Sequence, residues 1–444
     1  MEQKIQLSDH FGYKRLIRFT VPSILMMIVT SIYSVVDGFF ISNFVGKTSF
    51  AAVNFIMPFL MIVGVLGFMF GAGGSALIAK TMGEGRKEKA NEIFSLLTYA
   101  TLISGGVIAV VGFVFIRPIA IFLGAEGALL EDAIVYARIN LVGLPLLMVQ
   151  FAFTSFVVTA EKPKFGLWVT IICGVMNAIG DGLFMAVLQW GVVGAALATT
   201  LSQIVGGVIF LVYFARKNPT ILRLGKAKWD GRAILRTCTN GSSELMSSIS
   251  GSIVGMLYNA QLLKYAGENG VAAYGAIMYV NFIFIALFIG YSTGVAPVIS
   301  FHYGADNKEE LQSLRRKSRT IILVTSGAML GLSELLAVPL ARTFVGYDAE
   351  LFEMTVRAFR IYAFTFLFAG TSIFGSSFFT ALNDGLTSAL ISFLRTLVFQ
   401  IAAVMLMPLI WGIDGIWYSV VAAELTAVLV TMIFLTAKRK KYGY

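Results

Sequence analysis

The stretch Ile93–Phe115, IFSLLTYATLISGGVIAVVGFVF, contains 23 residues and no charge. At 1.5 Å per residue a helix of this length is about 34 Å long, enough to cross the roughly 30 Å hydrocarbon core of a bilayer. A membrane β-strand would instead show short alternation of apolar and polar residues. The stretch therefore predicts a transmembrane helix.

The composition of the whole chain agrees with this local prediction. Of its 444 residues, 57% are hydrophobic and 13% are charged, and the mean hydropathy is +0.82. Soluble domains carry about 25% charged residues, so an ordinary soluble globule is excluded. We expect lipid to be the main solvent of this protein.

Similar apolar stretches recur along nearly the whole chain. We predict twelve spans, near residues 16–44, 52–78, 93–115, 134–158, 166–187, 192–214, 238–263, 272–299, 319–341, 356–381, 387–410 and 415–437. Between spans, the charged segments 82–91 and 303–319 are interpreted as amphipathic helices on the membrane surface, or as solvated loops.

The loop charges predict the orientation. An even number of spans places both termini on one side, where most loop lysines and arginines also lie, whereas the other side holds few, among them Arg117, Lys264 and Arg342. The positive-inside rule then predicts cytoplasmic termini in a multi-pass protein of a bacterial or archaeal inner membrane. The formal charge of +10 is spread over these short loops, so no nucleic-acid partner is expected.

The chain repeats itself at an offset of 221 residues. Gly73 recurs as Gly294 and Pro118 as Pro339. Each half has six spans, so both halves enter from the same side and the repeat is parallel. We predict an all-α membrane protein of two pseudo-symmetric six-helix bundles, with an N-lobe at 1–215, a basic cytoplasmic linker at 216–236 and a C-lobe at 237–444.

Polar residues inside the spans break this repeat. The pairs at equivalent positions are Asp37 and Tyr258, Asn177 and Val398, Asp181 and Ala402, and Thr199 and Val420. Asp37, Asp181 and Thr199 lie about 10 Å from the same side of the membrane, and Asn177 is one helical turn from Asp181. Such an oxygen-rich pocket suits a hard monovalent cation or shared protons.

A structural role for these groups is the alternative, since each Asp could hydrogen-bond to neighbouring helices. A charged residue in a bilayer costs roughly 2.5 to 3.5 kcal/mol even on the lenient scale, which favours function. Pro22 could bend the first span, and Tyr33 stacks one turn below Asp37; both are assigned to conformational coupling, with a static kink as the alternative for Pro22.

The remaining polar and adaptable positions are weaker candidates. Arg395 and Glu424 could pair inside the second half. Residues that could line a central cavity are Glu244, Met26, Met57, Met61, Phe151 and Phe153.

Several strings resemble the multidrug and toxic compound extrusion (MATE) family over essentially the full chain. They are Asn177-Ala-Ile-Gly-Asp181, the segment Gly191 to Gln203, Val21-Pro22-Ser23 with Asp37, and Gly412-Ile-Asp-Gly415. The resemblance implies a two-lobed rocker-switch antiporter that exports cationic or amphipathic compounds against inward sodium or proton movement. It also implies a cation site at Asp37, Asn177, Asp181, Thr199 and the carbonyl of Ala195, with Pro22 as the bending point.

No GxxxxGK[ST] string occurs, so transport should be secondary, and no catalytic constellation predicts an enzyme. The strongest alternative is a flippase for a lipid-linked or other amphipathic substrate, although the membrane-embedded arginines are few. We expect no cofactor beyond the coupling ion, no metal other than sodium, and a monomer.

Overall fold

The computed structural model describes residues 5–444, so residues 1–4 of the predicted N-lobe lie outside the described residues. The first half consists of α1 (Tyr13–Phe44), α2 (Lys47–Gly64), α3 (Leu66–Gly83), α4 (Lys87–Phe122), α5 (Gly127–Thr159), α6 (Pro163–Asp181), the π-helical segment η1 (Gly182–Val187) and α7 (Gly191–Ala215). The second half consists of α8 (Gly231–Gly304), α9 (Lys308–Val345), α10 (Ala349–Ala363), α11 (Thr365–Ala381), α12 (Gly385–Phe393), the π-helical segment η2 (Leu394–Val398), α13 (Phe399–Leu406), α14 (Pro408–Ala437) and α15 (Arg439–Tyr442).

The described helices account for the predicted twelve crossings. Within residues 5–444, ten helices are long and apolar enough to span a membrane, and the pair α10 and α11, bent by 42°, makes an eleventh. The 74 residues of α8 would extend about 111 Å, too far for one crossing. Gly267 breaks α8 with a φ of 62°, so α8 contributes two crossings and brings the number to twelve.

The backbone repeats at the offset seen in the sequence. Gly46 and Gly267 have φ values of 95° and 62°, and Gly191 and Gly412 have φ values of 57° and 59°. Each pair is separated by 221 residues and starts a new crossing in its own half. A left-handed backbone favours glycine, so the repeated glycines are required by the chain path.

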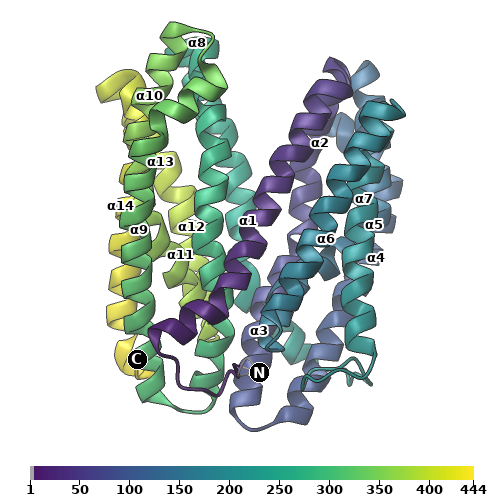
Figure 1. Cartoon of the computed structure of the whole chain (residues 1–444), viewed down its shortest axis with the longest axis vertical. Helices are drawn as coiled ribbons and strands as arrows, with labels where there is room; N and C mark the ends of the chain where they lie inside the picture. The colour runs from purple at the N-terminus through teal and green to yellow at the C-terminus, as the bar shows by residue number, and fades with distance from the viewer. Residues whose placement is uncertain (1–4) are drawn as a thin grey trace.

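The two halves form two lobes that lie closest together at one end and diverge toward the other (Figure 1). The N-lobe (α1 to α7) and the C-lobe (α8 to α14) converge at the end that carries residues 5–12 and 438–444, here called the terminal end, and their helices diverge toward the opposite end.

Close backbone contacts join the lobes near the terminal end. A Cβ added to Gly73 would lie 2.1 Å from the Thr237 carbonyl oxygen, and one added to Gly304 would lie 2.1 Å from the Lys80 carbonyl oxygen. The same holds for Gly83 against Phe301. We call these contacts the glycine seam, which consists of Gly73, Gly83, Gly241, Gly290, Gly294 and Gly304. No larger residue fits there without moving one lobe.

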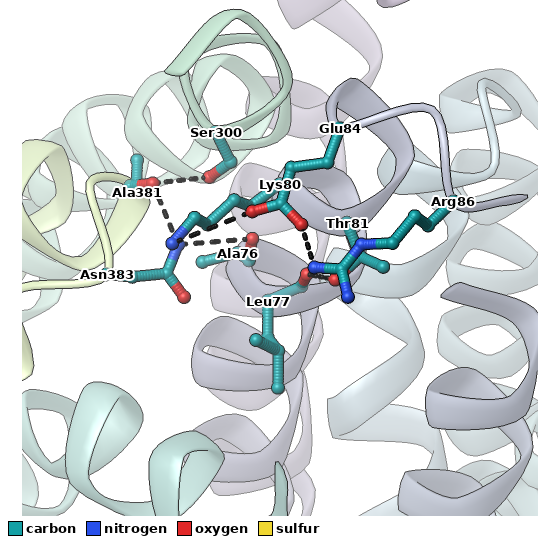
Figure 2. A network of polar contacts seen from close by, with 9 residues as sticks. All are labelled: Ala76, Leu77, Lys80, Thr81, Glu84, Arg86, Ser300, Ala381 and Asn383. Atoms are coloured by element: carbon teal, nitrogen blue, oxygen red, sulfur yellow. Dashed lines mark hydrogen bonds and ion pairs between the residues drawn. The ribbon is translucent and has the colours of Figure 1, made fainter. Parts of the chain in front are cut away.

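Polar contacts reinforce the seam (Figure 2). Asn383, in the turn after α11, donates to the Ala76 carbonyl of α3 at 3.3 Å, which is a direct bond between the lobes. Beside it, Ser300 donates to the Ala381 carbonyl at 2.8 Å. The C-lobe turn is therefore fixed against both α3 and α8.

The segment before α1 also bridges the lobes. The backbone N–H of Leu7 donates to Glu161 of the N-lobe at 2.9 Å, and that of Phe11 donates to Glu310 of the C-lobe at 2.9 Å. His10 Nδ1 lies 2.5 Å from the same Glu310 carboxylate. We call residues 5–12 the N-terminal clasp.

Two sequence predictions need correction. The segments 82–91 and 303–319 are not surface helices, because α3 ends at Gly83 and α4 begins at Lys87, while α8 ends at Gly304 and α9 begins at Lys308. Their charges belong to tight turns and to first helical turns. The non-helical linker covers residues 216–230, six fewer than predicted, because Asp230 caps α8 by accepting from the N–H of Ala233.

Candidate functional site

Polar side chains from α1, α6 and α7 meet inside the N-lobe. The Thr199 hydroxyl on α7 donates to the Asp37 carboxylate on α1 at 3.5 Å. Asp37 also interacts with the side chains of Asp181 and Asn177, both on α6. The structure thus brings together the four polar residues that the broken repeat singled out. Ala195 lies one turn before Thr199 on α7 and is fully buried.

These groups are buried, and their hydrogen bonding is incomplete. Asp181 is 0% exposed, Asn177 1% and Asp37 8%. Within the described residues, neither carboxylate oxygen of Asp181 accepts a hydrogen bond, and neither does the Asn177 amide oxygen. An ionised carboxylate can only accept hydrogen bonds, so two ionised carboxylates cannot hydrogen-bond to each other. Buried oxygens left without a donor are costly, and a cation or a shared proton would satisfy them.

The local sequence of α6 and α7 explains how Asp181 comes to lie in this position. Gly180 packs against Ala198, where an added Cβ would lie 3.0 Å from the alanine methyl, so α6 and α7 approach closely. Directly after Asp181 the helix widens into the π-helical segment η1. Such widened turns occur frequently at functional sites.

Tyr136 on α5 belongs to the same site, and the sequence analysis missed it. Its side chain is fully buried and interacts with Asp37, Asp181, Thr199 and Asn140. Tyr136 lies nine residues, or about 14 Å, from the start of α5, close to the depth predicted for Asp37. The position of Tyr136 along its span was therefore a signal that could have identified it as a candidate.

Helix α1 connects this site to the other lobe. Tyr33 packs on Gly174 of α6, with an added Cβ 3.5 Å from its ring. Pro22 is buried inside α1, which continues unbroken from Tyr13 to Phe44. Next to Pro22, Ile24 lies against Gly290 of the C-lobe, where an added Cβ would be 2.5 Å from its Cα. One helix thus carries both Asp37 and an inter-lobe contact.

The predicted cavity residues have different positions. Phe153 is fully buried among Phe94, Phe156, Phe210 and Phe214 inside the N-lobe. Met26 is 1% exposed and lies against Gly166 of α6. The prediction that these two side chains line a central cavity is wrong, because helices of their own lobe surround them.

The other four cavity candidates remain predictions. Met57 approaches the Tyr136 hydroxyl at 4.0 Å, Phe151 stacks on Phe68 with ring centroids 4.2 Å apart, and Met61 is 51% exposed. Glu244 is exposed and lies 13 residues, or about 20 Å, into α8, deeper than predicted because α8 begins at Gly231.

The equivalent region of the C-lobe holds a network in which side chains satisfy one another. The Tyr258 hydroxyl lies 2.9 Å from Gln400 Oε1 and 2.8 Å from the Ser419 hydroxyl. Arg395 Nε donates to both Glu424 carboxylate oxygens, at 3.0 and 2.9 Å. The predicted pairing of Arg395 with Glu424 is confirmed.

Two repeated six-helix lobes, held together at one end, with two neighbouring carboxylates buried between the helices of one lobe, have the architecture of secondary membrane transporters. A family model described as MatE matches residues 22–183 and 245–406, once in each lobe. The chain belongs to this family, the MATE transporters, which confirms the resemblance found in the sequence; it is a transporter and not an enzyme.

Individual relatives agree along their whole length. The multidrug export protein MepA of Staphylococcus haemolyticus is 21% identical over 444 residues, covering 99% of this chain and 97% of MepA. A crystal structure of MATE in complex with MaL6 superposes with a TM-score of 0.93 at 24% identity, covering 100% of this chain and 99% of that one. An outward-facing multidrug resistance MATE family transporter gives a TM-score of 0.92 at 24% identity, with the same coverage of both chains.

Proposed function

We propose that the protein is a cation-coupled antiporter that exports cationic or amphipathic compounds in exchange for sodium ions or protons. The observation that carries this proposal is the set of buried oxygens without donors on Asp181 and Asn177, beside the carboxylate of Asp37. Membership of the MATE family and the multidrug export assigned by name to MepA support the kind of substrate.

The coupling ion would bind between α1, α6 and α7. A proton could be shared by Asp37 and Asp181, and a sodium ion could take oxygens from these residues, Asn177, Thr199 and the Ala195 carbonyl. Either ion neutralises charge in a region of low dielectric and draws the three helices together. Because α1 also packs on Gly290 of the C-lobe, this movement would reach the inter-lobe contact through the segment around Pro22.

The two ends of the lobes suggest how access alternates. The glycine seam and the N-terminal clasp hold the terminal end together, while the opposite ends diverge. We place the terminal end in the cytoplasm of a bacterial or archaeal cell, because the loop charges predict it. The conformation is then outward-open, and a rocking movement of the lobes as a monomer would open the terminal end to load the substrate.

The test is export of a cationic dye such as ethidium from proteoliposomes with an imposed sodium or proton gradient. Asp37→Asn and Asp181→Asn should insert normally and lose gradient-driven export. Asp132→Asn is the matched control, since this N-lobe carboxylate accepts from Ser49 at 2.5 Å outside the site. Full export by both site variants would contradict the coupling assignment.

Transport of a lipid-linked oligosaccharide tests the flippase alternative. If the wild-type protein moves a lipid-linked oligosaccharide across the bilayer but moves no dye under any gradient, the proposed multidrug export is wrong. The two gradients applied one at a time decide between sodium and protons.

A further inference from the structure

An arginine-lined pocket opens at the terminal end of the C-lobe, far from the coupling site. Its cavity of about 320 Å³ is lined by Gln312, Arg315, Arg316, Arg319, Arg439 and Tyr444. We call it the arginine pocket. The three arginines on α9 come from its first turns, where the helix leaves the membrane, so the pocket lies at the level of lipid headgroups.

Among residues 5–444, no aspartate or glutamate side chain pairs with the guanidinium groups of this pocket. The ion pairs of the C-lobe within residues 5–444 use other basic residues, namely Lys308, Arg357, Arg360, Arg395 and Lys438. Arg439 Nε donates to the main-chain oxygen of Tyr444 at 3.1 Å, and Arg315 lies 4.9 Å over the Tyr444 ring. The nearby Asp384 carboxylate is engaged by Lys438 at 2.8 Å. Four guanidinium groups therefore face one cavity with no acidic side chain of the described residues paired to them.

An apolar crevice adjoins the arginine pocket on the membrane side. Arg315 and Arg319 line both, and the crevice continues between Ile322, Phe374, Met432 and Leu435. Its volume of about 30 Å³ takes one or two methylene groups rather than a whole chain. Met432 opens to the outside of the bundle with 37% of its surface exposed. A molecule in the pocket would thus have an anionic head and an apolar part directed toward lipid.

The arginines also break the repeat. At the offset of 221 residues, Arg315, Arg316 and Arg319 correspond to Phe94, Ser95 and Thr98 of the N-lobe. There Phe94 is fully buried in the lobe core, and the Ser95 hydroxyl receives the N–H of Gly225 from the linker at 3.1 Å. The scaffold therefore does not require arginine at these positions.

We propose that the arginine pocket binds the phosphate headgroup of an anionic phospholipid from the leaflet at the terminal end. Guanidinium forks match phosphate oxygens in geometry and charge. The adjoining crevice receives the first methylene groups of the lipid, and the rest of the chains lie along the lipid-facing side of α14. Free phosphate esters share the headgroup chemistry but lack the chain that fills the crevice.

The test is native mass spectrometry of the full-length protein in detergent, titrated with dioleoylphosphatidylglycerol or dioleoylphosphatidylcholine. We expect one phosphatidylglycerol adduct that binds at least about tenfold more tightly than phosphatidylcholine. Each arginine near anionic lipid contributes about fivefold in affinity, so R315Q/R319Q should weaken this adduct about thirtyfold. The single variant R319Q, at an exposed position, should weaken phosphatidylglycerol binding about fivefold. This variant tests the proposal even if the double variant does not fold.

A matched control removes two charges from the same end of the other lobe. R216Q/K217Q should change phosphatidylglycerol binding less than about twofold, because these residues lie outside the pocket. Unchanged binding in R315Q/R319Q or R319Q would overturn the proposal. So would glycerol 3-phosphate displacing phosphatidylglycerol at equal concentration, which would identify a site for soluble phosphate esters. Met432→Gln should weaken binding of phosphatidylglycerol and leave that of glycerol 3-phosphate unchanged.

Discussion

The two lobes place polar residues at equivalent points and satisfy them differently. In the N-lobe, Asp37 and Asp181 face each other, and the oxygens of Asp181 receive no hydrogen bond from any residue that the structure describes. In the C-lobe, Tyr258 stands at the position of Asp37 and is bonded to Gln400 and Ser419. The same helical framework thus holds an incomplete site on one side and a complete network on the other.

The hydrogen bonding of the two lobes determines where an ion can act. A buried network whose groups are all paired gains nothing from a further charge, whereas unpaired carboxylates gain the full energy of neutralisation. Only the N-lobe should therefore respond to the coupling ion. The C-lobe should behave as a rigid partner against which the N-lobe moves.

The largest effect is expected for Asp181→Ala, which places in the N-lobe the residue that the C-lobe carries as Ala402. Gradient-driven export should fall to the rate of protein-free liposomes. Thermal stability without the coupling ion should stay level or rise, since an unpaired buried charge costs roughly 2.5 to 3.5 kcal/mol. Dye transport and a melting curve check both outcomes. If the variant is less stable than wild type but still exports the dye, the role assigned to Asp181 is wrong.

The second test breaks the pair in the C-lobe. Arg395→Met leaves Glu424 buried and unpaired, which should cost about 3 to 5 kcal/mol of stability. The double variant Arg395→Met with Glu424→Met should recover most of this loss and retain gradient-driven export. Arg357→Met, which disrupts an exposed pair with Asp414, serves as control and should cost less than about 1 kcal/mol. Export lost in the stable double variant would place coupling chemistry in both lobes.

A smaller effect is expected at Tyr136. Tyr136→Phe removes the hydroxyl beside Thr199 and Asn140 but keeps the ring. The concentration of coupling ion that gives half-maximal export should rise about fivefold, equivalent to about 1 kcal/mol, with the maximal rate unchanged. Initial rates measured over a series of ion concentrations test this, and an unchanged ion dependence would remove Tyr136 from the site.

The smallest effect should follow Tyr258→Phe. Gln400 then loses a donor while Ser419 keeps its bond to the Ile416 carbonyl at 2.6 Å. The loss of stability should be about 1 kcal/mol, and export should stay within about twofold of wild type. A large fall in export with an intact melting temperature would show that the C-lobe network takes part in coupling.

The sequence was sufficient for the crossings and for four residues of the candidate site. Asp37, Asn177, Asp181 and Thr199 stood out because a repeat predicts an equivalent residue for each position, and these four depart from it. The structure brings them together, while their role stays a prediction. Tyr136 was missed because tyrosine is common in membrane helices and carries no charge to mark it.

Other features depend on contacts that spacing cannot show. The N-terminal clasp joins His10 to Glu310, 300 residues apart. The charged segments after α3 and α8 were misinterpreted because the first turns of a long helix have the same composition as a short surface helix. Met26 and Phe153 were assigned to a cavity because an apolar side chain has the same sequence signature whether it faces its own lobe or the other one.

The glycine seam has a consequence for passive leak. An exchanger that lets ions pass without cargo dissipates the gradient that drives it, so its closed end must exclude even a file of water molecules. Contacts between long side chains leave gaps as the side chains change rotamer, whereas backbone against backbone leaves none. Because Gly73 and Gly304 lie against the opposite lobe's main chain, we expect the terminal end to exclude water without a dedicated plug.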